Sequence, residues 1–231
     1  MKVRIKFSKH GVMKFIGHLD IMRYFQKAIR RSDIDIAYST GYSPHQIMSF
    51  AMPLGVGLES DGEYFDVEMN SMVSCEDIQE RLEAQMVPGM HILHVRVLPD
   101  NVGNAMASVA AARYRIQFRD NCEPCFDWKS QLASFYQKES ILVIKQTKKS
   151  EKELDLKPGI YEMYLDNESI VLMVDASSAG NIKPGLVMDA FYKENGQEPP
   201  EFAFEITRME TYANAGTTEE PYFVPLDEIE G

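Results

Sequence analysis

The chain has 231 residues, of which 45% are hydrophobic, and it carries a formal net charge of −11. This length suits one large domain or two small ones, and the apolar content argues against disorder. The negative charge makes general binding to nucleic acid or anionic membranes unexpected. However, residues 1–50 hold nine basic residues and only three acids, a net charge of +6 against −17 for the rest. A basic segment in an acidic protein predicts a specific anionic partner.

The cysteines and the apolar runs indicate a cellular location. Three cysteines are few and odd in number, which is typical of a reducing compartment. The opening MKVRIKFSKHG lacks the apolar core of a signal peptide. No apolar run approaches the roughly 20 residues of a membrane span. We therefore expect a cytoplasmic protein.

The spacing of apolar side chains predicts the first elements of the chain. Residues 2–8 alternate between apolar and mostly basic side chains, which predicts a strand with one buried and one basic face. Residues 12–16 read as a second extended piece. Residues 18–31 carry apolar side chains at helical spacing, which predicts a helix. The expected buried stripe of this helix consists of Leu19, Met22, Phe25 and Ile29.

The following elements complete the order of an α+β unit. The patterns predict a short strand at 34–38, a polar turn at 39–45, extended segments at 46–51 and 65–69, a helix at 75–86 and a strand at 91–98. Strand, helix, strands, helix, strand is the order of a ferredoxin-like βαββαβ unit. We assign this unit to residues 1–100.

Residues 101–231 repeat roughly the same order after a weakly patterned connection at 101–112. The patterns predict strands at 113–119, 141–145, 160–165, 170–174 and 202–212, helices at 126–136 and 184–196, a charged hairpin or loop at 148–157, and a loose acidic tail from residue 217. The predicted fold class is therefore α+β, with two tandem ferredoxin-like units and mainly antiparallel sheets.

The basic residues of the first segment form a candidate nucleic-acid surface. Phosphates bind cations that are spaced along a surface, and arginine adds bidentate geometry. Tyrosine rings offer faces on which unstacked bases can lie. The alternative is a solvated basic face, and arginines at the end of a helix also complement its dipole. The candidate binding residues are Arg4, Arg23, Lys27, Arg30, Arg31, Tyr42 and His45, with Tyr24 and Tyr38 as further platforms.

Acid–base chemistry is a second reading of the same segment. His18 and Asp20 stand in the first turn of the predicted helix, and His45 follows Pro44 in the polar turn. A histidine near hydroxyl groups can transfer protons or contact a phosphate. The alternatives are a dipole-complementing role for Asp20 and a structural turn around His45. The candidate catalytic residues are His18, Asp20 and His45.

Cys122 and Cys125 form a single CxxC pair. A zinc site needs two more ligands, and a redox pair would need a thioredoxin-like topology that nothing else in the chain suggests. We therefore expect neither a metal nor a cofactor.

The stretch from Lys14 to Met69 resembles the opening of the radical SAM-linked proteins, a family defined as a domain of unknown function. The residues that carry the resemblance are Phe15, Gly17, His18, Leu19, Asp20, Arg23, Arg30, Arg31, Tyr38, Ser39, Gly41, Tyr42, Pro44, His45, Pro53, Leu54 and Gly57. The resemblance implies a bacterial protein that is fused to, or encoded beside, a radical SAM protein, with a hint of RNA processing. This chain has no CxxxCxxC motif to hold an iron–sulfur cluster, so it resembles the stand-alone form.

We expect an RNA-binding module, for tRNA or rRNA, that presents its substrate to a separate radical SAM enzyme. Two alternatives stay open. The first is an RNA-processing or RNA-modifying enzyme that uses His45 or His18 as acid and base. The second is a protein-docking domain for the radical SAM partner, whose basic face would meet an acidic protein surface.

Overall fold

The computed structural model describes residues 1–146 and 151–230. The chain divides into two compact units: unit 1 comprises Met1–Ala110 and Arg208–Gly231, and unit 2 comprises Ala111–Thr207. This division differs from the predicted one, in which all residues after 100 formed the second unit. The chain returns to unit 1 because residues from Arg208 onward bond to the first hundred residues. These long-range bonds have no local signature in the sequence.

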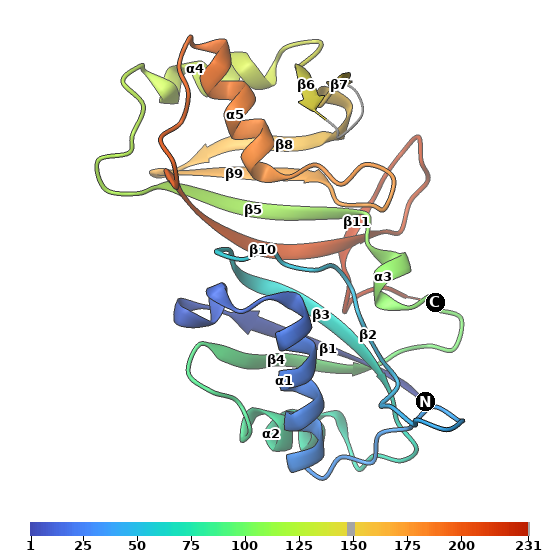
Figure 1. The fold of residues 1–231 in the computed structure, drawn as a ribbon. Coiled ribbons are helices and arrows are strands. Elements are labelled where there is room, and N and C mark those ends of the chain that lie inside the picture. The colour runs from blue at the N-terminus through green and yellow to red at the C-terminus, as the bar shows by residue number, and fades with distance from the viewer. Residues whose placement is uncertain (147–150, 231) are drawn as a thin grey trace. The chain divides into compact units, whose positions relative to one another are not determined.

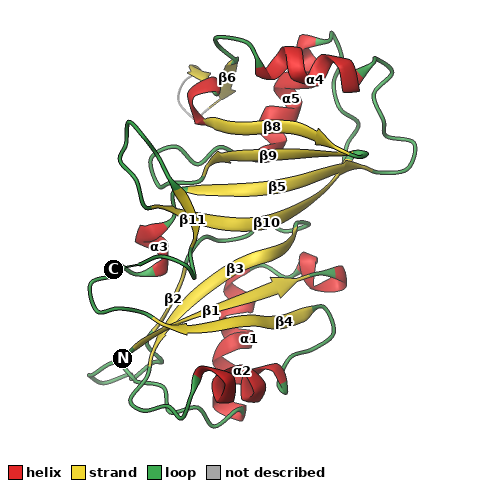
Figure 2. Ribbon diagram, turned by 180° about the vertical axis from the view of Figure 1, so that it is seen from behind, coloured by secondary structure: helices red, strands yellow, loops and turns green. Residues whose placement is uncertain are grey.

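Unit 1 is a mainly antiparallel sheet with two helices on one face (Figures 1 and 2). Its strands pair in the order β4-β1-β3-β2, and each of these pairs is antiparallel. Its elements are β1 (Lys2–Lys9), η1 (Gly11–Phe15), α1 (His18–Arg31), β2 (Met48–Phe50), β3 (Glu59–Glu68), α2 (Cys75–Glu83), β4 (Met90–Val97), α3 (Ala105–Ser108) and β11 (Phe223–Pro225).

The core of unit 1 lies between the sheet and helices α1 and α2. Phe25 of α1 packs against Phe7 of β1 and Phe65 of β3, with ring centroids 4.6 and 4.7 Å apart. The bounds predicted for α1 are confirmed. Its expected stripe was partly wrong, because Leu19 is 67% exposed and Ile21 is buried instead. Helical spacing alone does not determine which of two neighbouring stripes of α1 is buried. The aromatic cluster on the sheet determines which stripe packs against the core.

Two further expectations for unit 1 were wrong. Residues 11–15 form the 3₁₀ helix η1 rather than an extended piece, since Gly11 adopts a positive φ of 58° and starts a tight turn. The tail is anchored rather than loose. Strand β11 pairs with β10 (Phe204–Asn214), and Leu226 is fully buried.

Unit 2 holds antiparallel strands that pair in the order β5-β9-β8 and a separate hairpin of β6 and β7. Its two longer helices meet through Phe135 and Phe191, whose ring centroids are 5.2 Å apart. Of the charged hairpin or loop predicted at 148–157, residues 151–155 form strand β7, which pairs with β6, and residues 148–150 lie outside the described residues. The elements are β5 (Ala111–Phe118), α4 (Trp128–Tyr136), β6 (Leu142–Gln146), β7 (Glu151–Asp155), η2 (Lys157–Gly159), β8 (Ile160–Asp166), β9 (Ser169–Asp175), α5 (Pro184–Glu194) and the start of β10.

These observations confirm a mixed α+β fold with mostly antiparallel sheets. The assignment of both units to the ferredoxin-like fold stays a prediction. Among the described residues, none of the helices combines the length and the apolar character that crossing a membrane requires.

Candidate functional site

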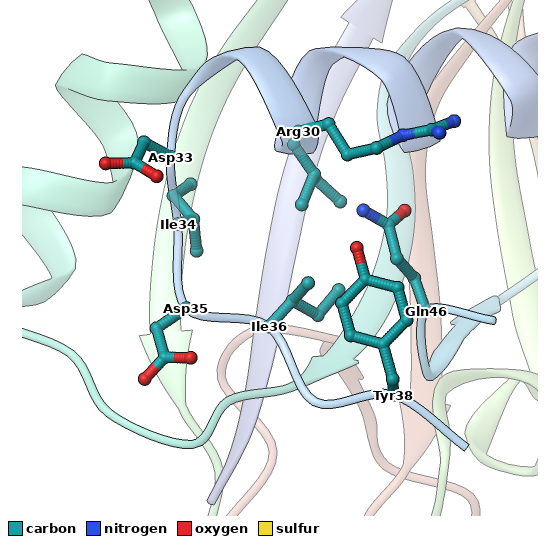
Figure 3. Close-up of a pocket in the computed structure, with 8 residues that line it drawn as sticks. Arg30, Asp33, Ile34, Asp35, Ile36, Tyr38 and Gln46 are labelled. Carbon is teal, nitrogen blue, oxygen red and sulfur yellow. The ribbon is translucent and has the colours of Figure 1, made fainter. Parts of the chain in front are cut away.

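A pocket in unit 1 lies between the end of α1, the segment that follows it and Gln46 (Figure 3). It has a volume of about 480 Å³ and is lined by Ile29, Arg30, Asp33, Ile34, Asp35, Ile36, Tyr38 and Gln46. A smaller hollow of about 170 Å³ is lined by Gln26, Arg30, Tyr38, Pro44, His45 and Gln46. Because Arg30, Tyr38 and Gln46 line both, we treat the two hollows as one site and call it the Gln46 pocket.

Backbone pairing brings Tyr38 and Gln46 together. The two residues form an isolated antiparallel bridge, and the Ile47 N–H donates to the Ala37 carbonyl at 3.0 Å. Residues that stand directly opposite in such a pair project their side chains from the same face. The predicted strand at 34–38 thus exists only as bridge residues, but it still sets Tyr38 beside Gln46.

The Gln46 side chain is buried without a hydrogen-bond partner. It is 5% exposed, and neither its amide oxygen nor its amide nitrogen has a partner among the residues that the structure describes. In Figure 3 the amide points toward the side of the pocket that carries Arg30. Leaving such a group unpaired costs about 1–3 kcal/mol of folding free energy. Native proteins leave few buried polar groups unpaired, so this amide marks an exception in unit 1.

Charged groups of both signs line the same pocket as this amide. Arg30 is exposed, and its Nε donates to the Gln26 carbonyl one turn earlier at 3.2 Å. The Asp35 carboxylate accepts hydrogen bonds from the Ser71 hydroxyl at 2.6 Å and from the Asn70 amide at 2.9 Å. These two bonds lower the pKa of Asp35. The pocket lining therefore includes an exposed cation, Arg30, and a carboxylate, Asp35, whose two oxygens are already bonded to Asn70 and Ser71.

The loop formed by residues 39–45 borders the smaller hollow. Hydrogen bonds between Ser39 and His45 close this loop, and we call them the Ser39–His45 clasp. The Ser39 N–H donates to the His45 carbonyl at 2.8 Å, and the His45 N–H donates to Ser39 Oγ at 3.1 Å. The same oxygen lies 2.8 Å from His45 Nδ1. Gly41 turns the loop at a φ of 117°, which favours glycine. Tyr42 stands fully exposed beyond the clasp, where its ring is open to a partner.

The basic residues predicted on α1 are exposed and form one stripe. Positions 23, 27, 30 and 31 fall on the same side of an α-helix. Arg23 pairs with Asp20 at 3.1 Å, and Arg31 Nε donates to the Gln85 side-chain oxygen at 3.2 Å. Arg23, Lys27, Arg30 and Arg31 form what we call the α1 cation row, which runs along the helix to the Gln46 pocket.

The three residues predicted for acid–base chemistry do not share a pocket. His45 lines the smaller hollow together with Gln26. His18 lies about 12 Å of helix rise before that level. Its ring packs edge-on against Phe50 with centroids 5.4 Å apart, and burial lowers the pKa of His18. Asp20 is exposed on the first turn. The contacts described for these residues do not bring them into one acid–base group.

Arg4 lies inside unit 1 rather than on its surface. Its side chain is fully buried, and its guanidinium donates to both carboxylate oxygens of Asp66 at 2.8 and 3.0 Å. On the same strand face, Lys2 donates to a backbone carbonyl and Lys6 to the Glu210 carboxylate. The predicted basic face of β1 is thus covered by acids and carbonyls from distant parts of unit 1. Arg4 is therefore not available to an external phosphate.

Sequence reasoning missed Gln46, the residue that marks the pocket. A signal for it was present, since Gln46 stands two residues before Met48 and four before Phe50. Residues at this spacing share one face of an extended segment. Phe50 is buried in the core, so an amide in register with it is an anomaly.

The cysteines contribute nothing to this pocket. Cys75, Cys122 and Cys125 are free thiols, and the CxxC pair belongs to unit 2. Within the described ranges 1–146 and 151–230, no group of three or more histidine, cysteine or acidic side chains is placed to hold a metal ion.

Comparison with known proteins places the chain in a family. No curated protein matches the sequence. Among solved structures, the chain is similar to one in the crystal structure of a Cbf5-Nop10-Gar1 complex, with a TM-score of 0.48 and 8% sequence identity. The similarity covers 90% of this chain and 48% of that one, so the present chain spans about half of its length. A likeness at this level does not indicate a shared activity.

A family model assigns the chain to a protein family, which the similarity to a solved structure does not do. The model of an uncharacterized protein conserved in bacteria (DUF2344) matches residues 2–184. This match covers most of the chain and includes every residue that lines the Gln46 pocket. The protein therefore belongs to this bacterial family.

Proposed function

We propose that the protein binds single-stranded RNA along the α1 cation row and into the Gln46 pocket. The observation that carries the proposal is a row of exposed cations that ends at a buried amide without a partner. The cations of the row would hold successive phosphates, and the pocket would receive an unstacked base. Non-specific attraction is not enough for such binding, because the whole chain has a net charge of −11.

A single strand fits this arrangement better than a duplex. The edge of a base reaches a recessed amide only when the base is unpaired and unstacked. Tyr38 is 48% exposed beside the pocket, and Tyr42 is fully exposed at the nearby loop. Stacking on an aromatic ring contributes roughly 1–3 kcal/mol per base and tolerates any sequence. The two rings would therefore keep flanking bases unstacked from each other.

The test is RNA retention with matched charge changes. Total cellular RNA and short single-stranded oligomers are bound to the wild type, to Lys27→Ala/Arg30→Ala and to the control Lys183→Ala/Lys193→Ala in unit 2. All four residues are exposed, and both double variants lose two charges. Each lost phosphate contact lowers the salt-dependence slope by roughly 0.7 for a single strand.

We expect the α1 variant to bind more weakly, with a slope smaller by about 1.4. The control should behave as the wild type. Absence of RNA retention by the wild type, even at low salt, would contradict the proposal. Equal losses in both variants would also contradict it, because they would report net charge rather than a site.

Docking on a protein partner is a second candidate function. Val12, Phe15 and Leu19 are 77%, 63% and 67% exposed around η1 and the start of α1. Val56 is 62% exposed on a loop whose Gly57 N–H donates to the Lys14 carbonyl at 2.8 Å. Exposed apolar side chains on adjoining segments are typical of interaction sites. The surface is separate from the residues that line the Gln46 pocket.

The resemblance to radical SAM-linked proteins suggests which partner would dock there. We propose that the protein presents bound RNA to a separate radical SAM enzyme encoded beside it. A Phe15→Ser/Leu19→Ser variant should lose co-purification with that enzyme and keep its RNA binding. Retained co-purification would contradict this docking surface.

The fold of the two units supports RNA binding only at the level of fold class. We propose that both units are ferredoxin-like. The antiparallel order β4-β1-β3-β2 of unit 1 and the order β5-β9-β8 of unit 2 support the assignment.

A further inference from the structure

We propose that Tyr64, Glu210 and Asp227 share a proton that holds the C-terminal segment, residues 223–228, on the sheet of unit 1, and that this hold weakens as the pH rises. All three residues belong to unit 1. The segment contains β11 and Asp227, and Leu226 within it is fully buried. We call the three residues the Tyr64 latch, and their action is independent of the proposed RNA binding.

Two strands of the sheet contribute cations that contact the segment. Arg4 of β1 donates to the Leu226 carbonyl at 2.8 Å, and Arg96 of β4 donates to the Asp227 carbonyl. His94 Nδ1 of β4 lies 2.7 Å from Asp227 Oδ2. Arg4 and Arg96 stand directly opposite in the register of the two strands, and like charges in such a pair are unfavourable. Oxygens of the segment therefore stabilise cations of the sheet, so the attachment of the segment depends on charge.

The Tyr64 hydroxyl contacts two carboxyl groups at once. Its oxygen lies 2.8 Å from Glu210 Oε1 and 2.8 Å from Asp227 Oδ1. A phenol has one proton, which it can donate fully to only one of these oxygens. The other contact becomes a full hydrogen bond only when that carboxyl group is itself protonated and donates to the phenol oxygen. Because Tyr64 is only 2% exposed, both contacts are shielded from solvent, and the arrangement calls for a second proton.

Glu210 is the group that holds the second proton. Burial raises the pKa of Glu210, and its ion pair with Lys6 does not reverse the shift. Burial also acts to raise the pKa of Asp227, but the hydrogen bond with His94 and the charge of Lys6 outweigh burial and lower it. Burial and the two carboxyl groups raise the pKa of Tyr64, so the phenol keeps its own proton. Protonated Glu210 thus donates to Tyr64, and Tyr64 donates to ionised Asp227.

A rise in pH removes the proton that joins Glu210 to the other two groups. Ionised Glu210 then competes with Asp227 for the single Tyr64 proton, and two largely buried negative charges face one donor. The folded pKa of Glu210 lies above its ordinary value of 4.5. The stabilisation is therefore complete below 4.5 and is lost as the pH rises through the folded pKa.

Three further charged residues contact Glu210 or Asp227 in the part of the chain that the structure describes, namely Lys6, His94 and Arg96. Histidine is the only type among them that ordinarily changes charge between about pH 5 and 8. A pH effect on the segment therefore has two candidate sources, His94 and Glu210, which substitution separates.

The experiment measures the opening of the segment as a function of pH. Amide hydrogen exchange is followed by NMR between about pH 5 and 8, and each rate is converted to a protection factor with the intrinsic rate at that pH. The Leu226 N–H, which donates to the Thr211 carbonyl at 3.1 Å, reports the segment, and amides at the centre of β1 report unit 1 as a whole. The variants are Glu210→Gln, His94→Gln and the control Glu205→Gln, at an exposed position of the same strand as Glu210.

We expect the protection factor of Leu226 in the wild type to fall as the pH rises, by roughly ten-fold for each pKa unit by which folding raises Glu210. The fall should persist in His94→Gln and Glu205→Gln and disappear in Glu210→Gln, which has no carboxyl proton to lose. Protection in β1 should stay constant in all four proteins. A further variant, Tyr64→Phe, lacks the hydroxyl and should show weaker Leu226 protection already at about pH 5.

Protection of Leu226 that does not change with pH in the wild type overturns the latch. A fall that survives in Glu210→Gln, or that only His94→Gln removes, assigns the pH effect to another group and also overturns it. A parallel fall in β1 does the same, because it reports unfolding of the whole unit rather than release of the segment. Wild-type protection in Tyr64→Phe would show that the phenol does not hold the segment. None of these residues lines the Gln46 pocket, so each of these results leaves the proposed RNA binding untouched.

Discussion

Tyr38 and Gln46 stand directly opposite each other in an isolated antiparallel bridge, yet one is half-exposed and the other is buried. The bridge therefore joins an aromatic ring that solvent can reach to a buried amide that has no hydrogen-bond partner in the described chain. Such a pair combines a sequence-tolerant stacking surface with a selective hydrogen-bonding group. The arrangement depends on local backbone pairing, which makes its consequences testable by single substitutions.

Replacing the amide of Gln46 should stabilise the protein. Gln46→Met removes a buried group without a partner, so we expect the free energy of unfolding to rise by about 1 kcal/mol. Urea denaturation of both proteins measures the change. Gln131→Met, at an exposed position, should stay within about 0.5 kcal/mol of the wild type. A loss of stability in Gln46→Met would show that the amide serves the fold rather than a ligand.

Removing Arg4 should be strongly destabilising. Arg4→Met leaves the buried Asp66 carboxylate without its cation, and breaking such a pair costs about 3–5 kcal/mol. Arg23→Met, which removes an exposed arginine, should change stability by less than about 0.5 kcal/mol. Equal effects of the two single variants in a denaturation series would contradict the buried placement of Arg4.

A double substitution separates the ion pair from the burial of either partner. Replacing a buried pair with apolar residues is often neutral, so Arg4→Met/Asp66→Leu should recover part of the lost stability. Recovery should be incomplete, because Asp66 also accepts a hydrogen bond from the Ala105 N–H at 2.6 Å. A double variant that is less stable than Arg4→Met alone would contradict this account.

His10 and His18 should titrate on opposite sides of the ordinary histidine value of 6.5. Burial lowers the pKa of His10, but its hydrogen bonds and charge interactions with Glu59 and Asp61 outweigh burial and raise it. Burial lowers the pKa of His18, and the nearby charge of Glu63 does not reverse the shift. NMR titration of the imidazole protons, assigned with His10→Gln and His18→Gln, measures both values.

The two shifts predict a stability maximum near pH 6.5 from these groups. The stabilisation from His10 is complete below 6.5 and is lost as the pH rises through its folded pKa. The stabilisation from neutral His18 is present above 6.5 and is lost as the pH falls through its folded pKa. His10→Gln should flatten the alkaline side of the profile and His18→Gln the acid side. The reverse pattern would show that the shifts are misassigned.

Opening the Ser39–His45 clasp should loosen the loop without unfolding unit 1. Ser39→Ala removes the oxygen that accepts from the His45 N–H and contacts its ring. We expect faster amide hydrogen exchange at His45 and a global stability change of about 1 kcal/mol or less. Ser43→Ala, at an exposed position in the same loop, is the control. Unchanged exchange at His45 would indicate that the backbone bridge alone holds the loop.

The sequence by itself determined the local elements and much of the pocket's lining. Alternation predicted β1, and helical spacing predicted the bounds of α1, because both periodicities follow from backbone geometry within a few residues. The polar turn after α1 drew attention to Tyr38 and His45, and the charge count drew attention to Arg30. These three residues line the same pocket because they are close in sequence as well as in space.

Only the tertiary structure decided which polar residues are free. Arg4 and Arg30 are equally basic in the sequence, but Arg4 meets Asp66 across 62 positions and is buried, whereas Arg30 stays exposed. Gln46 is unpaired because the segments around it bury its amide and supply no partner in the described chain. A local pattern records the charge and polarity of a residue, but desolvation and pairing depend on groups that the folded chain brings from far away.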